Sequence, residues 1–79
     1  MQIRVLLVSV KGSKELERCP IVANSIVEAA IALSNHAKIK GYDLFKLDQG
    51  CLTGCHYEKE DGSVMYLEEN KSKSKVKRR

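Results

Sequence analysis

The sequence predicts a small α+β domain, in which one helix packs on one face of a small, mainly antiparallel sheet. Three observations lead to this fold class. Residues 25–41 carry a complete helix pattern, residues 3–10 are largely apolar and precede it, and residues 55–68 follow it with the pattern of a hairpin. A sheet with one apolar face needs another element to cover that face, and the helix fits this role. The expected element order is β(β)αβββ.

A first strand is expected over residues 3–10. Its centre, Val5-Leu6-Leu7-Val8, is apolar without alternation, as in a central strand that is buried on both faces. Lys11-Gly12-Ser13 indicates a turn. Residues 15–23 are interpreted as an irregular second strand that pairs back on the first. Because Pro20 has no backbone N–H to donate, this second strand is expected at an edge of the sheet or broken there.

The helix is the clearest element of the sequence. Ser25 and Glu28 form a capping box, in which the serine hydroxyl accepts the N–H of Glu28 and the carboxylate accepts the N–H of Ser25. The helix is therefore expected to begin at Ile26, and Gly41 suits the left-handed position that follows its last turn. The expected apolar stripe comprises Ile26, Ala29, Ala30, Leu33 and Ala37, widened by Val27 and Ile31.

A further strand is expected over residues 42–47, since apolar and aromatic residues dominate it. Strand alternation places Phe45 and Leu47 on one face and Tyr42 and Leu44 on the other. Residues 49–54 are expected to form a loop, because glycines flank its Cys-Leu-Thr segment.

The closing hairpin is expected to pair residues 55–60 with residues 63–68 around Asp61-Gly62, which is a strong signal for a two-residue type I′ turn. A turn of two residues sets the register so that Tyr57 faces Tyr66. Together with Tyr42, these two side chains are candidates for a partner-binding surface, by stacking on unpaired bases or by contact with a protein. The alternative is that the tyrosines cover the core against the helix.

The positive charge of the chain is confined to its last nine residues. Residues 1–70 contain eight Lys/Arg and ten Asp/Glu, a net charge of −2, whereas residues 71–79 contain six Lys/Arg and no acid, a net charge of +6. We expect one domain over residues 1–70 and a disordered basic tail over residues 71–79. The tail is expected to bind nucleic-acid phosphates without reading sequence, and its alternatives are a solubilising end or a targeting signal. Its candidate contact residues are Lys71, Lys73, Lys75, Lys77, Arg78 and Arg79.

The odd number of cysteines argues for reduced thiols in a reducing compartment, so a cytoplasmic location is expected. A structural zinc site is the alternative function, built from Cys19, Cys51 and Cys55 with His36 or His56, because zinc prefers thiolate and imidazole ligands. The spacing argues against this site. Cys51 and Cys55 are one residue farther apart than in the usual knuckle, and the adjacent Cys55 and His56 point to opposite faces of a strand. No metal and no cofactor is therefore expected.

A catalytic site is not evident, and we expect a protein that is not an enzyme. Cys55 stands beside His56 in the sequence, but no third residue that would orient this pair is apparent. Asp43 and Asp48 do not have a spacing that implies paired carboxylates, and the loop over residues 49–54 lacks a phosphate-binding pattern. No apolar run approaches the length that crosses a bilayer, so no membrane partner is expected.

Two segments carry a resemblance to a known group of proteins. The pattern Ile21-Val-Ala23-x-Ser25-x-x-Glu28-Ala29-x-x-Ala32, followed by a strand and the hairpin Tyr57-Glu-Lys-Glu-Asp61-Gly62-x-x-x-Tyr66, resembles small phage-encoded α+β proteins. Some of those are anti-CRISPR inhibitors that block a host RNA-guided complex. The resemblance lies in element order and turn chemistry over most of residues 3–68. It implies a mobile-element protein that acts by binding, and it implies no functional residue.

These observations together predict a small non-enzymatic binding protein. Its partner is expected to be a protein or a nucleoprotein complex, and the basic tail is expected to add nucleic-acid affinity. A sheet face left open by the single helix would also allow a homodimer.

Overall fold

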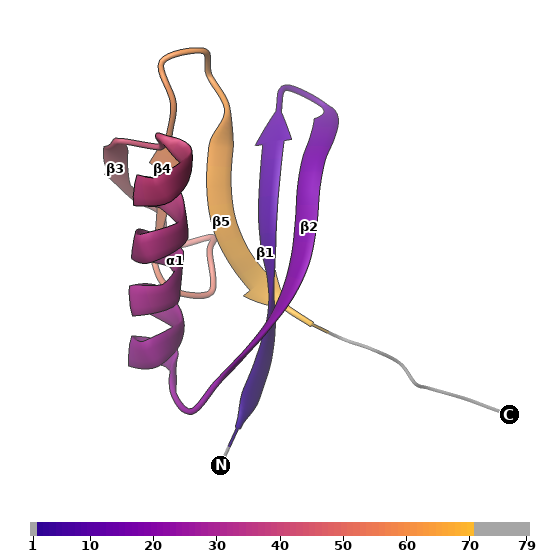
Figure 1. The fold of residues 1–79 in the computed structure, drawn as a ribbon, viewed down its shortest axis with the longest axis vertical. Coiled ribbons are helices and arrows are strands. Elements are labelled where there is room, and N and C mark those ends of the chain that lie inside the picture. The colour runs from indigo at the N-terminus through magenta and orange to yellow at the C-terminus, as the bar shows by residue number, and fades with distance from the viewer. Residues whose placement is uncertain (1, 71–79) are drawn as a thin grey trace, which may run out of the picture.

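The computed structural model describes residues 2–70. Its five strands form one antiparallel sheet in the order β2-β1-β5-β4-β3, and the helix α1 lies against one face of that sheet (Figure 1). The expected fold class and the element order β-β-α-β-β-β are confirmed. The six elements are β1 (Ile3–Lys11), β2 (Lys14–Ala23), α1 (Ile26–Lys40), β3 (Leu44–Leu47), β4 (Cys55–Glu58) and β5 (Val64–Glu69).

The first strand is flanked on both sides, by β2 and by β5. Val5 and Leu7 are buried on the side of the helix, and Val8 is buried on the opposite side. Burial on both faces confirms the expectation for this strand. The second strand lies at the edge of the sheet, as expected from Pro20, which stands opposite Leu6 in the ladder.

The ends of α1 are capped by the residues that the sequence indicates. The backbone N–H of Glu28 donates to Ser25 Oγ at 3.1 Å. The Glu28 carboxylate accepts the backbone N–H of Asn24 at 3.2 Å, one residue before the position that a standard capping box uses. At the other end Gly41 has φ of 83°, and the N–H of Tyr42 donates to the carbonyl of Ala37 at 2.8 Å, which closes a Schellman motif.

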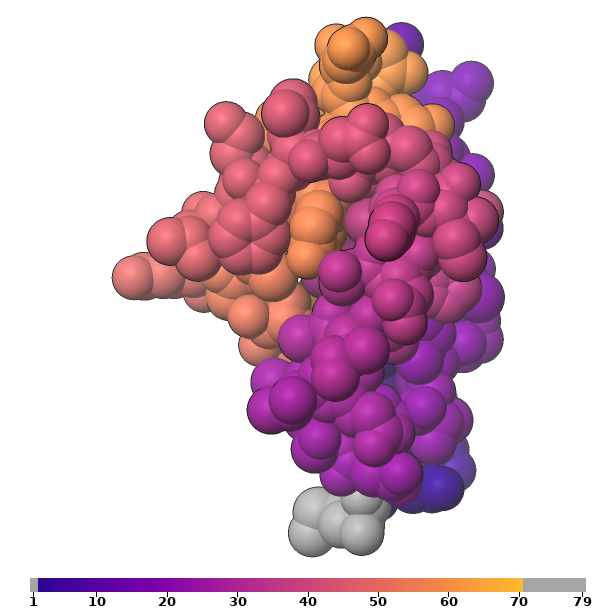
Figure 2. Space-filling model, turned by 60° about the vertical axis from the view of Figure 1, so that its left-hand side comes forward, coloured from indigo at the N-terminus to yellow at the C-terminus, as the bar shows by residue number. Residues whose placement is uncertain are grey.

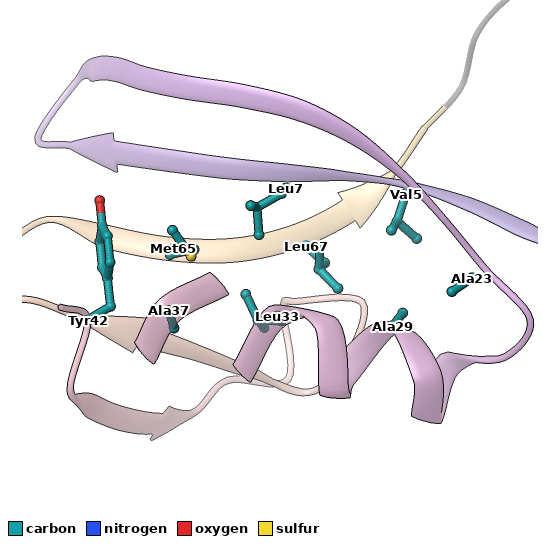
Figure 3. Packing of buried hydrophobic residues seen from close by; sticks show 9 residues of the cluster. All are labelled: Val5, Leu7, Ala23, Ala29, Leu33, Ala37, Tyr42, Met65 and Leu67. Atoms are coloured by element: carbon teal, nitrogen blue, oxygen red, sulfur yellow. The ribbon is translucent and has the colours of Figure 1, made fainter. Parts of the chain in front are cut away.

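The core lies between α1 and the sheet (Figure 3). The helix contributes a narrow stripe with one large side chain, Leu33, between the small Ala29 and Ala37. Val27 and Ile31 were expected to widen this stripe, but they are 70% and 55% exposed. The helix packs on the core through Ala29, Leu33 and Ala37, so Val27 and Ile31 lie on the solvent side. Ile26, which was also expected in the stripe, is 44% exposed. The buried cluster comprises Val5, Leu7, Ala23, Ala29, Leu33, Ala37, Tyr42, Met65 and Leu67.

The closing hairpin has a register that differs by one residue from the expected one. Tyr57 stands opposite Met65, not opposite Tyr66. The N–H of Lys59 donates to the carbonyl of Ser63, and the N–H of Gly62 donates to the carbonyl of Lys59, so the loop has three residues. Gly62 has φ of 89°, which is the left-handed residue of a three-residue loop. The prediction of a two-residue type I′ turn is therefore wrong.

The helix covers part of the sheet only. It packs against β2, β1 and β5, whereas β4 and β3 extend beyond it. On the helix side, Cys55 and Tyr57 of β4 still pack against the edge of the core, whereas Phe45 and Leu47 of β3 are 54% and 83% exposed.

Candidate functional site

A polar cluster lies on the sheet face opposite α1, at the end of β3. Asp48 follows β3, Cys51 lies in the loop over residues 48–54, and His56 projects from β4. One ligand atom from each of the three side chains lies within 4.8 Å of the other two. The cluster belongs to a pocket of about 380 Å³, whose other lining residues are Val10, Gly50, Glu58, Val64 and Tyr66.

The loop is folded so that its two ends meet. The N–H of Asp48 donates to the carbonyl of Gly54 at 2.8 Å, and the N–H of Cys51 donates to the carbonyl of Asp48 at 3.1 Å. The N–H of Gly50 donates to Asp48 Oδ1 at 2.9 Å, so the side chain of Asp48 also holds the turn. These bonds return Cys51 toward β4 and bring its sulfur close to His56.

His56 lies between two carboxylates. Its Nδ1 is 2.9 Å from Asp48 Oδ2, its Nε2 is 2.7 Å from Glu58 Oε2, and its side chain is only 15% exposed. Ionised carboxylates only accept hydrogen bonds, so the protonated imidazole satisfies both contacts. The hydrogen bond with Glu58 is the main cause that raises the pKa of His56, and Asp48 adds to this effect against the opposing effect of burial.

The pKa values of the other two members of the cluster are shifted in opposite directions. The pKa of Asp48 is lowered, chiefly by the hydrogen bond from the backbone of Gly50 and next by His56. The pKa of Cys51 is raised to about 11, first by burial and then by its contact with Asp48. The thiol of Cys51 is therefore protonated at neutral pH, which does not favour a role as a free nucleophile.

The residues considered for a zinc site are only partly brought together. Cys51 and His56 meet, whereas Cys19 on β2 and Cys55 on β4 pack against the core on the side of α1. His36 belongs to α1, on that same side of the sheet. The expectation that Cys55 and His56 point to opposite faces is confirmed. Asp48 is the member of the cluster that the sequence reasoning missed, and its Asp-x-Gly turn was the signal that could have indicated it.

The three tyrosines do not form a common surface. Tyr42 is 4% exposed and belongs to the core, with Lys59 Nζ 4.7 Å above its ring. Tyr57 lies on the helix side of the sheet, where its ring packs edge-on against that of Phe45, with the two ring centroids 5.4 Å apart. Tyr66 lies on the opposite face, beside Val8. The expected shared face is wrong, because the three-residue hairpin loop shifts the register by one residue.

The helix-side surface of β3 and β4 forms a second candidate site. Phe45 and Leu47 are 54% and 83% exposed there, and the half-buried Tyr57 lies beside Phe45. We call these three residues the uncovered face. Figure 2 shows that the molecule is hollowed on this side, between α1 and the two strands. Ile26 and Leu52, also exposed, line a pocket of about 300 Å³ with residues of β1 and β5.

The face opposite α1 is not an open apolar surface throughout. Val8 on this face is only 2% exposed, and it stands between Arg18 of β2 and Tyr66 of β5 in the sheet. Arg18 Nη2 also donates to Glu68 at 3.0 Å. Long side chains of this kind cover apolar surface with their stems. The homodimer expected through an open sheet face remains a prediction. The role of the tail remains a prediction as well, because residues 71–79 lie outside the described residues.

Within the described chain, no helix is long and apolar enough to cross a membrane. Comparison of the sequence with protein-family models and curated proteins, and of the fold with solved structures, gives no match. The resemblance to small phage-encoded proteins therefore remains a prediction from the sequence.

Proposed function

We propose that this protein is a small, non-catalytic binding protein, and that the uncovered face is its docking surface for another protein. The observation that carries the proposal is the exposure of Phe45 and Leu47 on β3, which extends beyond α1. Apolar side chains that are exposed singly are normal on a protein surface, but a contiguous group at a hollow is typical of an interaction site.

The chemistry of this face favours a protein over a nucleic acid. Phe45, Leu47 and Tyr57 offer no cation to a phosphate, and aromatic residues are enriched in the centres of protein interfaces. Residues 1–70 have a net charge of −2. Full burial of an exposed side chain of this size contributes about 1.5–3 kcal/mol, so Leu47 would gain most of that against a partner and Phe45, which is 54% exposed, about half of it. A cytoplasmic location belongs to the same proposal and is supported by the three free cysteines.

Two equally exposed residues allow a controlled test. Leu47 on the uncovered face is 83% exposed, and Ile39 in the last turn of α1 is 81% exposed. A photo-crosslinking amino acid is placed at either position in the full chain, and the products formed in cells are compared. We expect a protein partner to be crosslinked from position 47 and not from position 39. With the purified partner, Leu47→Asp should weaken binding at least tenfold, and Ile39→Asp should leave it unchanged.

The proposal would be overturned if Leu47→Asp and Ile39→Asp affected binding equally. It would also be overturned by a crosslinked product of twice the chain mass alone, because that product would indicate self-association. Both substitutions are at exposed positions, where the loss of stability is usually within about 0.5 kcal/mol. A difference in partner binding between the two variants is therefore not caused by unfolding.

We further propose that the basic tail adds attraction to nucleic acid, so that a nucleoprotein complex suits the protein as a partner. The charge division at residue 70 supports this proposal. The test is nucleic-acid binding over a salt series, with the full chain and with residues 1–70. If six cations release counterions at about 0.7–0.9 each, log K should fall with log salt with a slope of up to roughly −4 to −5. Equal binding by both chains would refute a role for the tail.

A further inference from the structure

We propose that Asp48, Cys51 and His56 form a binding site for a single zinc ion, with Glu58 as the carboxylate that orients His56. This site is independent of the proposed docking surface, because it lies on the opposite face of the sheet. It also differs from the zinc set considered from the sequence, of which it retains Cys51 and His56 alone.

The donor set determines the class of metal. A thiolate, an imidazole and a carboxylate are the three ligand types that zinc binds in proteins. Calcium and magnesium take oxygen ligands, so the sulfur of Cys51 and the nitrogen of His56 do not suit them. Three protein ligands leave a fourth tetrahedral position for a water molecule. The three residues line a pocket of about 380 Å³ together with Val64 and Tyr66, so a water molecule has room beside them.

The geometry is close to that of a tetrahedral site. Bonds of about 2.0–2.3 Å place the ligand atoms roughly 3.3–3.8 Å apart. In the structure the three ligand atoms lie within 4.8 Å of one another, and His56 Nδ1 is 2.9 Å from Asp48 Oδ2. Movements of about 1 Å thus complete the site. The metal takes the place of the proton between His56 Nδ1 and Asp48, and of the proton on Cys51 Sγ.

The hydrogen bond between Glu58 and the ring of His56 provides the second argument. Metal-binding histidines commonly donate their other ring N–H to a carboxylate, which holds the ring in one orientation. In this structure, Nε2 of His56 is 2.7 Å from Glu58 Oε2, and Nδ1 is the nitrogen that faces Asp48. The loop is also pre-formed, because Gly50 holds the Asp48 carboxylate and the ends of the loop are bonded to each other.

The site is tested with the full chain after chelation and dialysis, using native mass spectrometry with Zn²⁺ and absorption with Co²⁺. We expect one metal ion per chain and a thiolate-to-cobalt charge-transfer band. Cys51→Ser should abolish this band and weaken metal binding at least about 100-fold. Cys19→Ser is the matched control, since it removes a thiol outside the cluster and should change neither result. Glu58→Gln should weaken metal binding by about 10–100-fold with the band retained.

The cobalt band of the unmodified chain reports a sulfur ligand directly, so the test does not depend on a variant that folds. Absence of this band, or of a stoichiometric zinc ion in the mass spectrum, would overturn the proposal and leave the cluster as a set of hydrogen bonds that holds the loop. A band that persists in Cys51→Ser would overturn it as well, because the ligand would then be another cysteine.

Discussion

Leu33→Ala should be among the most destabilising substitutions in α1. Leu33 is fully buried and is the one large side chain of the helix stripe, between Ala29 and Ala37. The substitution removes three carbon atoms, about 2.4 kcal/mol at about 0.8 kcal/mol for each methylene-sized group. A residual cavity of about 40 Å³ would add about 1 kcal/mol. We therefore expect a loss of about 3–3.5 kcal/mol in the free energy of unfolding.

The assay is urea denaturation followed by far-ultraviolet circular dichroism. With an m value of about 1 kcal/mol/M, at the low end for small proteins, the midpoint should fall by roughly 3 M and m should not change. Ile39→Ala in the same helix is the control, because Ile39 is 81% exposed and its removal should cost less than about 0.5 kcal/mol. A loss below about 1.5 kcal/mol for Leu33→Ala, or an equal loss for Ile39→Ala, would refute the packing argument.

Three further predictions concern turns and caps. Gly62→Ala should lower the free energy of unfolding by about 1–2 kcal/mol, because φ of 89° is strained for alanine. Gly62→Asn should lower it less in the same urea assay, and equal losses would contradict the left-handed assignment. Ser25→Ala should cost about 1 kcal/mol through loss of the helix cap, whereas Ser13→Ala in an exposed turn should be neutral. Hydrogen bonds from Ser63 lower the pKa of Asp61, so its contribution is present above the unfolded-state pKa of about 3.9 and is lost as pH falls through the lower folded-state value. The stability difference between the wild type and Asp61→Asn should shrink below about pH 4, and a difference that stays constant to about pH 2 would refute this.

The helix and the order of the elements along the chain could be predicted because their signals are local. Ser25 and Gly41 mark the ends of α1 through backbone geometry that involves only neighbouring residues. Pro20 likewise restricts its strand to an edge whatever the rest of the fold is. Tyr42 was misplaced although its signal is local as well. The sequence pattern assigns it to a strand, but the Schellman motif turns the chain so that its ring enters the core.

The hairpin shows how one local ambiguity changes the view of function. Asp61-Gly62 is compatible with a two-residue turn and with a three-residue loop, and the two differ by one position in register. That difference moves Tyr57 and Tyr66 to opposite faces. The polar cluster could not be predicted for a related reason. The spacing of Asp48 and Gly50 indicates a turn, but Asp48 and His56 meet because the ends of the loop are also bonded, and no residue spacing specifies the bond from the Asp48 N–H to the Gly54 carbonyl.

The order of the sheet has a consequence for synthesis of the chain. β5 is the last strand along the described chain, yet it lies at the centre of the sheet, where Leu67 pairs with Leu7 of the first strand. A nascent chain that ends before Val64 has its first hairpin and its helix but lacks Met65 and Leu67, two fully buried residues of the core. Because contacts between distant segments slow folding, the growing chain must expose apolar surface until β5 is made, and it is most open to chaperones and aggregation in that interval.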